Sequence, residues 1–208
     1  MAIPGESQKD FRAGAIDANH VLASTLSKAH NGRMKPVLTC AAALFAASFA
    51  SAQFQSPPAE TSATIAGKSL SIHYSAPSVH NRKIFGPGGR ISQDETYPVW
   101  RAGANSATSF HTDADLDIGG LKAPKGDYTI FVLVDDPDHW QLIINKQTHQ
   151  WGLTYNQNMD LGRVKMTMSK PPAKIETFKM TLSSAGANTG KLQLEWDNYI
   201  ASVPIKVL

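Results

Sequence analysis

The sequence predicts an all-β domain, an immunoglobulin-like or jelly-roll-like antiparallel β-sandwich of about nine strands. Apolar and polar residues alternate with a period of two in many short runs, as they do in half-buried strands. Residues that favour turns separate these runs, and after residue 60 no stretch has the periodicity of an amphipathic helix. Of the sandwich and the barrel, which share this pattern, we expect the sandwich.

The first predicted strands form a hairpin. Residues 69–74 alternate, and Gly67 before them indicates a turn from a strand around 62–66. Residues 75–98 contain several Pro and Gly residues and cannot form a helix or a central strand. We expect a long ordered loop there, and such loops are often functional.

The middle of the domain continues the pattern. Residues 107–118 alternate as one strand, whereas 127–134 are almost continuously apolar, which is typical of a strand buried on both faces. Asp and Pro residues at 135–138 predict a turn, and 140–145 provide the second arm of the hairpin.

The C-terminal third predicts four further strands. Alternating runs occur at 163–169, 178–182, 192–196 and 203–207, with breaks at turn residues between them. Proline cannot donate to a ladder of hydrogen bonds. Pro204 therefore indicates an edge position or an outward bulge in the last strand.

The segment from Met34 to Ala52 has the layout of a Sec-type secretory signal peptide. A short basic start precedes an apolar run of about 13 residues, shorter than the roughly 20 that a membrane-spanning helix needs. Small residues follow, and we expect cleavage between Ala52 and Gln53. The protein is therefore expected in the periplasm or outside the cell, with no membrane span after cleavage. A lipid anchor at Cys40 is a poorer match.

The signal peptide divides the chain into four parts. Residues 1–33 are interpreted as a mis-assigned or disordered N-terminal extension, 34–52 as the signal peptide, 53–59 as a linker and 60–208 as a single β-sandwich domain. About 150 residues are enough to bury one core.

Composition excludes several functions. Of 20 Lys and Arg and 17 Asp and Glu residues, five and three lie in residues 1–52, which leaves 15 and 14 for the mature domain. The net charge of the mature domain is therefore close to zero, and it lacks the excess of basic residues that nucleic-acid binding requires. Cys40 is the single cysteine and leaves with the signal peptide, so a cysteine nucleophile or thiolate metal site is excluded.

The first cluster of unusual residues is Trp100, Arg101, Gly103 and Asn105. In an extended segment Trp100 and Arg101 point to opposite faces. One interpretation is a core tryptophan followed by a structural turn, with Arg101 paired to a carboxylate. The other is an Arg101 and Asn105 pair at a loop mouth that recognises an anionic or carbonyl group.

The second cluster comprises Asn145, Lys146, Trp151, Tyr155 and Asp160. Aromatic rings beside amide, amine and carboxylate groups are typical of a site for a small polar ligand such as a sugar. The same mixture also serves as a clamp that holds a loop. Both interpretations stay open.

Arg82, in the long loop, either reaches a ligand together with Arg101 or pins the loop through backbone carbonyls. Metal and cofactor motifs are lacking. The five histidines of the mature domain have no ligand spacing, and the acidic residues at 113–117 fail the EF-hand pattern. The nucleophile motif G-x-S-x-G is also lacking. We therefore expect no cofactor, no metal and no assigned catalytic residue.

The chain resembles an uncharacterised bacterial family, the domain of unknown function 2911, over about residues 60–208. The resemblance rests on pieces that occur in one order: Tyr74-Ser75, Pro77-Ser78, Arg82, Ile84-Phe85-Gly86, Trp100-Arg101, Gly103-Ala104-Asn105, Gly126, Tyr128, Trp140, Ile144-Asn145-Lys146, Trp151-Gly152, Tyr155, Leu194, Trp196 and Val203-Pro204-Ile205. It implies a secreted β-rich domain and carries no reaction or substrate.

These observations favour a non-catalytic binding or envelope-accessory module for a small polar or anionic ligand. The alternatives are an exported hydrolase that uses loop carboxylates on a polysaccharide or ester, and a structural protein-interaction module. The ligand and the oligomeric state stay open, and whether the protein is an enzyme is undecided, with the motifs leaning against it. The ligand-binding candidates are Arg82, Arg101, Asn105, Asn145, Lys146, Trp151 and Tyr155.

Overall fold

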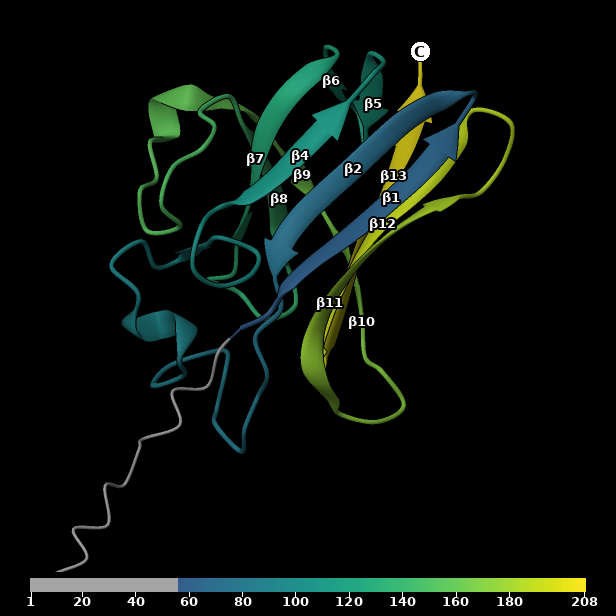
Figure 1. The fold of residues 1–208 in the computed structure, drawn as a ribbon. Coiled ribbons are helices and arrows are strands. Elements are labelled where there is room, and N and C mark those ends of the chain that lie inside the picture. Colours follow the sequence, from purple (N-terminus) through teal and green to yellow (C-terminus); the bar gives the residue numbers. More distant parts are fainter. Residues whose placement is uncertain (1–55) are drawn as a thin grey trace, which may run out of the picture. The chain divides into compact units, whose positions relative to one another are not determined.

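The computed structural model describes residues 56–208, which form two antiparallel sheets (Figure 1). The first sheet contains β1 (Pro58–Ile65), β2 (Lys68–Ser75), β3 (Val99–Trp100), β4 (Thr108–Thr112), β7 (Gly126–Leu133), β8 (Gln141–Asn145) and β9 (Asp160–Lys165). The second contains β5 (Leu116–Ile118), β6 (Leu121–Ala123), β10 (Thr167–Ser169), β11 (Ile175–Ser184), β12 (Thr189–Asp197) and β13 (Tyr199–Val207).

The strand order is β1-β2-β4-β7-β8-β9 in the first sheet, where β3 also pairs with β7. In the second sheet the order is β11-β12-β13-β5-β6, and β10 pairs with β13. Two short 3₁₀ helices, η1 (Ile91–Gln93) and η2 (Gln157–Met159), lie in loops. The predicted all-β sandwich is confirmed. The first strand begins at Pro58, within the segment that the sequence assigns to a linker.

The structure has thirteen strands where the sequence predicts about nine. The run 107–118 divides into β4 and β5, which belong to different sheets, and the run 163–169 divides at Met166 into β9 and β10. Because the core lies between the sheets, a chain that crosses from one to the other keeps the same alternation of buried residues. The alternation therefore hides the crossing.

Burial follows the predicted pattern within single strands. Leu70, Ile72 and Tyr74 of β2 are buried, and in β7 the five residues 128–132 are buried in succession. The outer face of β7 is covered because Phe131 packs in a second apolar cluster, against which Tyr155 of the β8–β9 loop lies. That loop, residues 146–159, thus lies over part of the outer face of the first sheet.

A cluster of aromatic rings joins the sheets within the core. Trp100 of β3 stacks on Trp196 of β12 with 5.6 Å between ring centroids, and Phe178 of β11 lies 4.9 Å from Trp100. Phe85 of the long loop 76–98 contacts the same group, including Trp140 at 4.8 Å. Such pairs are favourable by about 0.5–1.5 kcal/mol beyond area burial. The cluster anchors β3, and therefore the loop that follows it.

Pro204 lies in an interior strand, so its predicted edge position is wrong. β13 pairs with β12 from Tyr199 to Lys206, and Pro204 stands opposite Lys191. On the other side of β13, β10 pairs with 200–202 and β5 pairs with 205–207. Pro204 falls between these two neighbours, where its carbonyl accepts a hydrogen bond from the Gly119 amide at 3.0 Å. The missing N–H therefore leaves no strand partner unsatisfied.

The predicted extension 1–33, the signal peptide 34–52 and its cleavage point between Ala52 and Gln53 lie outside the described residues. Among the residues that are described, no helix has the length and apolar character needed to cross a membrane.

Candidate functional site

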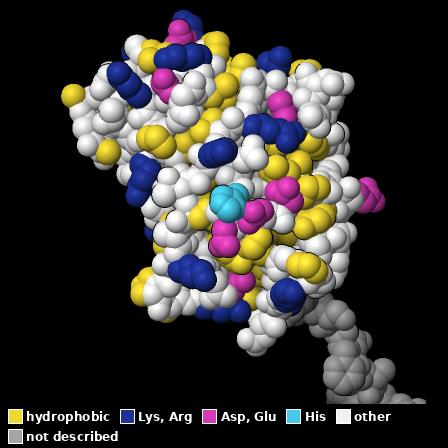
Figure 2. Space-filling view, turned by 180° about the vertical axis from the view of Figure 1, so that it is seen from behind, with side chains coloured by type: hydrophobic (Ala, Val, Ile, Leu, Met, Phe, Trp, Pro, Cys, Tyr) yellow, Lys and Arg dark blue, Asp and Glu magenta, His cyan; other side chains and the backbone are white. Residues whose placement is uncertain are grey.

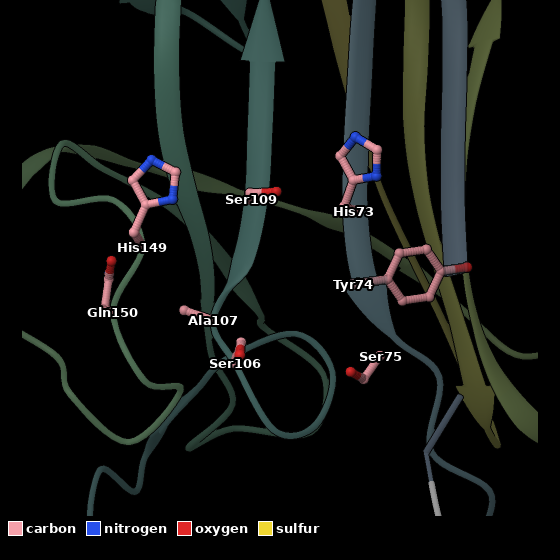
Figure 3. A pocket seen from close by; sticks show the side chains of 8 residues that line it. All are labelled: His73, Tyr74, Ser75, Ser106, Ala107, Ser109, His149 and Gln150. Atoms are coloured by element: carbon pink, nitrogen blue, oxygen red, sulfur yellow. The ribbon is translucent and has the colours of Figure 1, made fainter. Parts of the chain in front are cut away.

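A groove of about 370 Å³ lies on the outer face of the first sheet, between β2, β4 and two loops (Figure 3). The register places His73 of β2 directly opposite Ser109 of β4, and both side chains point outward. The volume is at the lower end of the ~300–1,000 Å³ common for small-molecule sites. The lining residues are His73, Tyr74, Ser75, Ser106, Ala107, Ser109, His149 and Gln150.

The loop from β3 to β4 forms one end of the groove. Ala102 and Asn105 adopt left-handed φ angles of 49° and 60°. The Thr108 hydroxyl donates to the Ala102 carbonyl at 2.8 Å, and the Trp100 indole N–H donates to the Gly103 carbonyl at 3.0 Å. Buried hydrogen bonds therefore hold this turn in its strained conformation.

Arg101, at the start of this loop, forms a buried ion pair. Its Nη2 donates to Oδ2 of Asp94 at 3.0 Å, and the two side chains are 9% and 8% exposed. Oδ1 of Asp94 accepts a second hydrogen bond, from Arg90 at 2.8 Å. Burial lowers the pKa of Arg101, and the charge of Asp94 opposes that shift. Arg101 Nε is buried without a hydrogen-bond partner.

The β8–β9 loop pairs with the β3–β4 loop. The Ala107 amide donates to the Gln150 carbonyl at 3.3 Å, and the Gly152 amide donates to the Asn105 carbonyl at 3.2 Å. Gly152 is required at this contact because a Cβ there would overlap the side chain of Arg101 and the Asn105 carbonyl. Glycine thus lets the two loops approach closely.

The loop pairing places His149 and Gln150 in the groove lining and Trp151 next to them. His149 adopts a left-handed φ of 62°. The Gln150 side-chain oxygen accepts a hydrogen bond from Thr129 at 3.4 Å, while its amide nitrogen is buried without a partner. Trp151 forms an isolated β-bridge with Ser106 and is 54% exposed.

A hydrogen-bonded clamp holds the other end of the β8–β9 loop. Asn145 is fully buried, and its amide donates to Asp160 Oδ1 at 2.8 Å and to the Asn156 carbonyl at 3.0 Å. The Tyr155 hydroxyl donates to Asp160 Oδ2 at 2.6 Å and accepts from Arg163 at 2.8 Å. Burial, together with the hydrogen bond to Asp160, raises the pKa of Tyr155 to about 12. The clamp fixes the loop that carries Gln150.

The seven candidates from the sequence fall into separate places. Trp151 and Asn105 adjoin the groove, since Asn105 donates to the Ser75 hydroxyl at 3.4 Å, and Arg101 packs behind the loop pairing. Asn145 and Tyr155 belong to the clamp. Lys146 is exposed. Arg82 donates to the carbonyls of Ser78 and Val79 at 2.6 and 3.0 Å, which pins the long loop.

Most groove residues were not singled out by the sequence. His73 and Ser109 lie in runs that the sequence predicts as strands, and neither they nor Gln150 are among the candidate ligand-binding residues. The signal that would have found them is the pairing of β2 with β4, which places these outward faces side by side. Neither residue type is unusual on a solvent face, so composition alone gives no signal.

His111, on the same outer face, contacts two carboxylates. Its Nδ1 lies 2.7 Å from Asp127 and its Nε2 lies 3.0 Å from Asp113, and these hydrogen bonds raise the pKa of His111. All three side chains are well exposed. No cluster of three or more potential metal ligands occurs within residues 56–208. Figure 2 shows basic and acidic side chains spread over one face among hydrophobic ones.

Comparison with known proteins identifies the domain. The model of the family described as "Protein of unknown function (DUF2911)" matches residues 56–205, which include nearly all of the described sandwich and the whole groove. No curated protein and no solved structure matches the chain. The family match covers more than half of the sequence and agrees with the resemblance seen in its motifs, and the chain therefore belongs to the DUF2911 family of proteins of unknown function.

Proposed function

We propose that this DUF2911 domain is a non-catalytic binding module that holds a small polar ligand in the groove on the first sheet. The observation that carries the proposal is the hollow itself, in which hydroxyl and imidazole groups from two strands and two loops face one space of about 370 Å³. Small-molecule sites combine a concave surface with a few convergent polar groups of this kind.

The backbone around the groove supports the proposal. Ala102, Asn105 and His149 all have left-handed φ angles, and each such angle costs about 1–3 kcal/mol in a residue other than glycine. Strain of this kind persists where the surroundings enforce it, and it clusters at ligand sites. Here the loop pairing and the clamp of Tyr155 and Asp160 enforce it.

The lining argues against glycoside hydrolysis by paired carboxylates. Glycoside hydrolysis uses two carboxylates that face each other across the substrate. The eight lining residues include neither Asp nor Glu. Glu60 stands beside the groove, 3.5 Å from His73, with both side chains more than half exposed. The groove thus lacks the pair of facing carboxylates that glycoside hydrolysis uses.

We also propose that this module acts outside the cytoplasm, because the sequence predicts a signal peptide at residues 34–52. N-terminal sequencing of the protein from the expressing cell tests that part. We expect the mature chain to begin at Gln53. A mature protein that retains residues 1–33 would contradict export through this signal.

A thermal-shift screen tests the binding proposal. A ligand that binds the folded state raises its stability, by about 2.7 kcal/mol at a hundredfold excess over Kd. We expect a stabilising compound for the wild type and a much smaller shift for Ser109→Ala and His73→Ala, whose side chains point into the groove. Ser71→Ala is the matched control, because Ser71 lies on the same face of β2 outside the lining. A compound that stabilises all four proteins equally does not bind this groove.

A further inference from the structure

We propose that the groove binds a neutral saccharide, with one sugar ring stacked on Trp151 and its hydroxyl groups bonded to the groove wall. This inference rests on the proposed function and names its ligand class. A sugar ring presents an apolar C–H face and a polar rim of hydroxyls. The groove and its neighbouring indole combine the two surfaces that such a ring requires.

The loop pairing directs Trp151 toward the groove. Trp151 stands directly opposite Ser106 in an antiparallel bridge, and residues paired in this way project from the same face. The side chain of Ser106 lines the groove (Figure 3), and we infer that the indole of Trp151, which is not itself a lining residue, projects toward the same side. Two loops held by hydrogen bonds and by the clamp therefore present an aromatic side chain next to a polar hollow.

The exposure of Trp151 sets it apart from the other tryptophans. Trp100, Trp140 and Trp196 are 2%, 2% and 4% exposed, whereas Trp151 is 54% exposed. Leaving apolar surface in water costs about 25 cal/mol per Å². A ring stacked on the indole would recover part of this cost, and the fixed loop means that little conformational freedom is lost on binding.

The polar groups of the groove suit hydroxyls better than anions. Serine hydroxyls and neutral imidazoles can each donate and accept hydrogen bonds, as sugar hydroxyls do. The lining contains no Lys, Arg, Asp or Glu. The nearby guanidinium of Arg101 is paired with Asp94, and that of Arg82 is bonded to backbone carbonyls. A free charge for an anionic ligand is therefore lacking among the lining residues.

Fluorescence quenching tests the stacking directly. In the free protein, acrylamide should quench mainly Trp151, because the other three tryptophans are buried. We expect saturable protection from acrylamide when neutral mono- and oligosaccharides are titrated into the purified full-length protein. Trp151→Phe should abolish the optical signal while retaining most of the affinity measured by calorimetry. Trp151→Ala should weaken binding about tenfold, as expected for loss of one aromatic contact.

A second pair of variants tests the groove itself. Ser109→Ala should weaken saccharide binding roughly three- to tenfold, the effect of one hydrogen bond. Ser71→Ala should bind as the wild type does. If Trp151→Ala fails to fold by circular dichroism, then Trp151→Phe and Ser109→Ala decide the question. Saccharide binding that none of the groove variants weakens would overturn the inference.

Charged probes separate this inference from the proposed function. Inorganic phosphate and glucuronate are titrated under the same conditions. If an anion binds, Ser109→Ala weakens its binding and neutral sugars do not compete with it, then the groove is a binding site and the saccharide inference is wrong. If neither neutral sugars nor any compound of the thermal-shift screen binds, both proposals fall. Binding of neutral sugars that is insensitive to salt supports the inference.

Discussion

Replacing Asp94 with alanine should destabilise the domain because it would leave the buried guanidinium of Arg101 without a counter-ion. The carboxylate of Asp94 is 8% exposed and accepts hydrogen bonds from both Arg101 and Arg90. The side chain of Arg101 is 9% exposed, and its Nε already lacks a partner. An arginine cannot shed its charge as a buried lysine can. Without Asp94 the guanidinium would remain buried, charged and without an anion.

The expected loss follows from burial. Breaking a buried ion pair by removing one partner costs about 3–5 kcal/mol. For a domain of this size, each kcal/mol lowers Tm by about 2–4 °C, which predicts a fall of roughly 6–20 °C. Arg90 is the other partner of Asp94, and its side chain is 45% exposed. Arg90→Ala should therefore lower the free energy of unfolding by only about 1 kcal/mol or less.

Urea and thermal unfolding of four proteins test this reasoning. They are the wild type, Asp94→Ala, Arg90→Ala and the double variant Asp94→Leu/Arg101→Met. The double variant should recover most of the loss, because an apolar pair of similar volume often replaces a buried ion pair at little cost. The reasoning is refuted if Asp94→Ala lies within about 1 kcal/mol of the wild type, or if the double variant is less stable than the single one.

Three further predictions follow from the outer face of the first sheet. Burial and a hydrogen-bonded carboxylate raise the pKa of Tyr155 to about 12, whereas the pKa in the unfolded chain is about 10, so the stability linked to Tyr155 is present below about pH 10 and lost between the two values. Urea unfolding from pH 9 to 12 should therefore show a smaller loss of stability for Tyr155→Phe than for the wild type. An identical slope in the two proteins would contradict this prediction. NMR titration should give His111 a pKa above about 6.5, and Asp127→Asn should lower that pKa. The stability linked to His111 is present at lower pH and is lost as pH rises through its raised pKa. Gly152→Ala should cost about 1–3 kcal/mol in urea unfolding, because the new methyl would overlap Arg101; a neutral effect would show that the two loops can separate freely.

The sequence predicts the sandwich and the inward residues of its strands well, but not the division of strands between sheets. Leu70, Ile72 and Tyr74 face the core as their alternation indicates. The same alternation continues from β4 into β5, although the chain changes sheet there. Period-two patterning reports which side of a strand is apolar, and in a sandwich that side faces the same core from either sheet.

The candidate site is less predictable, because register creates it. Trp151 and Asn105 stood out as unusual residues in loops, and both adjoin the groove. Ser109 and His73 belong to the groove because β2 and β4 place them opposite each other, a relation that residue types do not encode. Gln150 belongs to it because one loop pairs with another 45 positions earlier in the chain, between Ser106 and Trp151.

Pro204 also bears on how the second sheet selects its pairing. β10 and β5 share one side of β13, and hydrophobic patterning does not oppose a slide of either strand by two residues, since the same side chains would still face the core. A slide of β5 toward Tyr199 would bring the middle of that strand opposite Pro204, where the ladder requires an N–H that proline lacks. A slide of β10 in the other direction meets the same obstacle. Pro204 thus disfavours both shifted pairings, so that β10 pairs only with residues 200–202 and β5 only with residues 205–207 of β13.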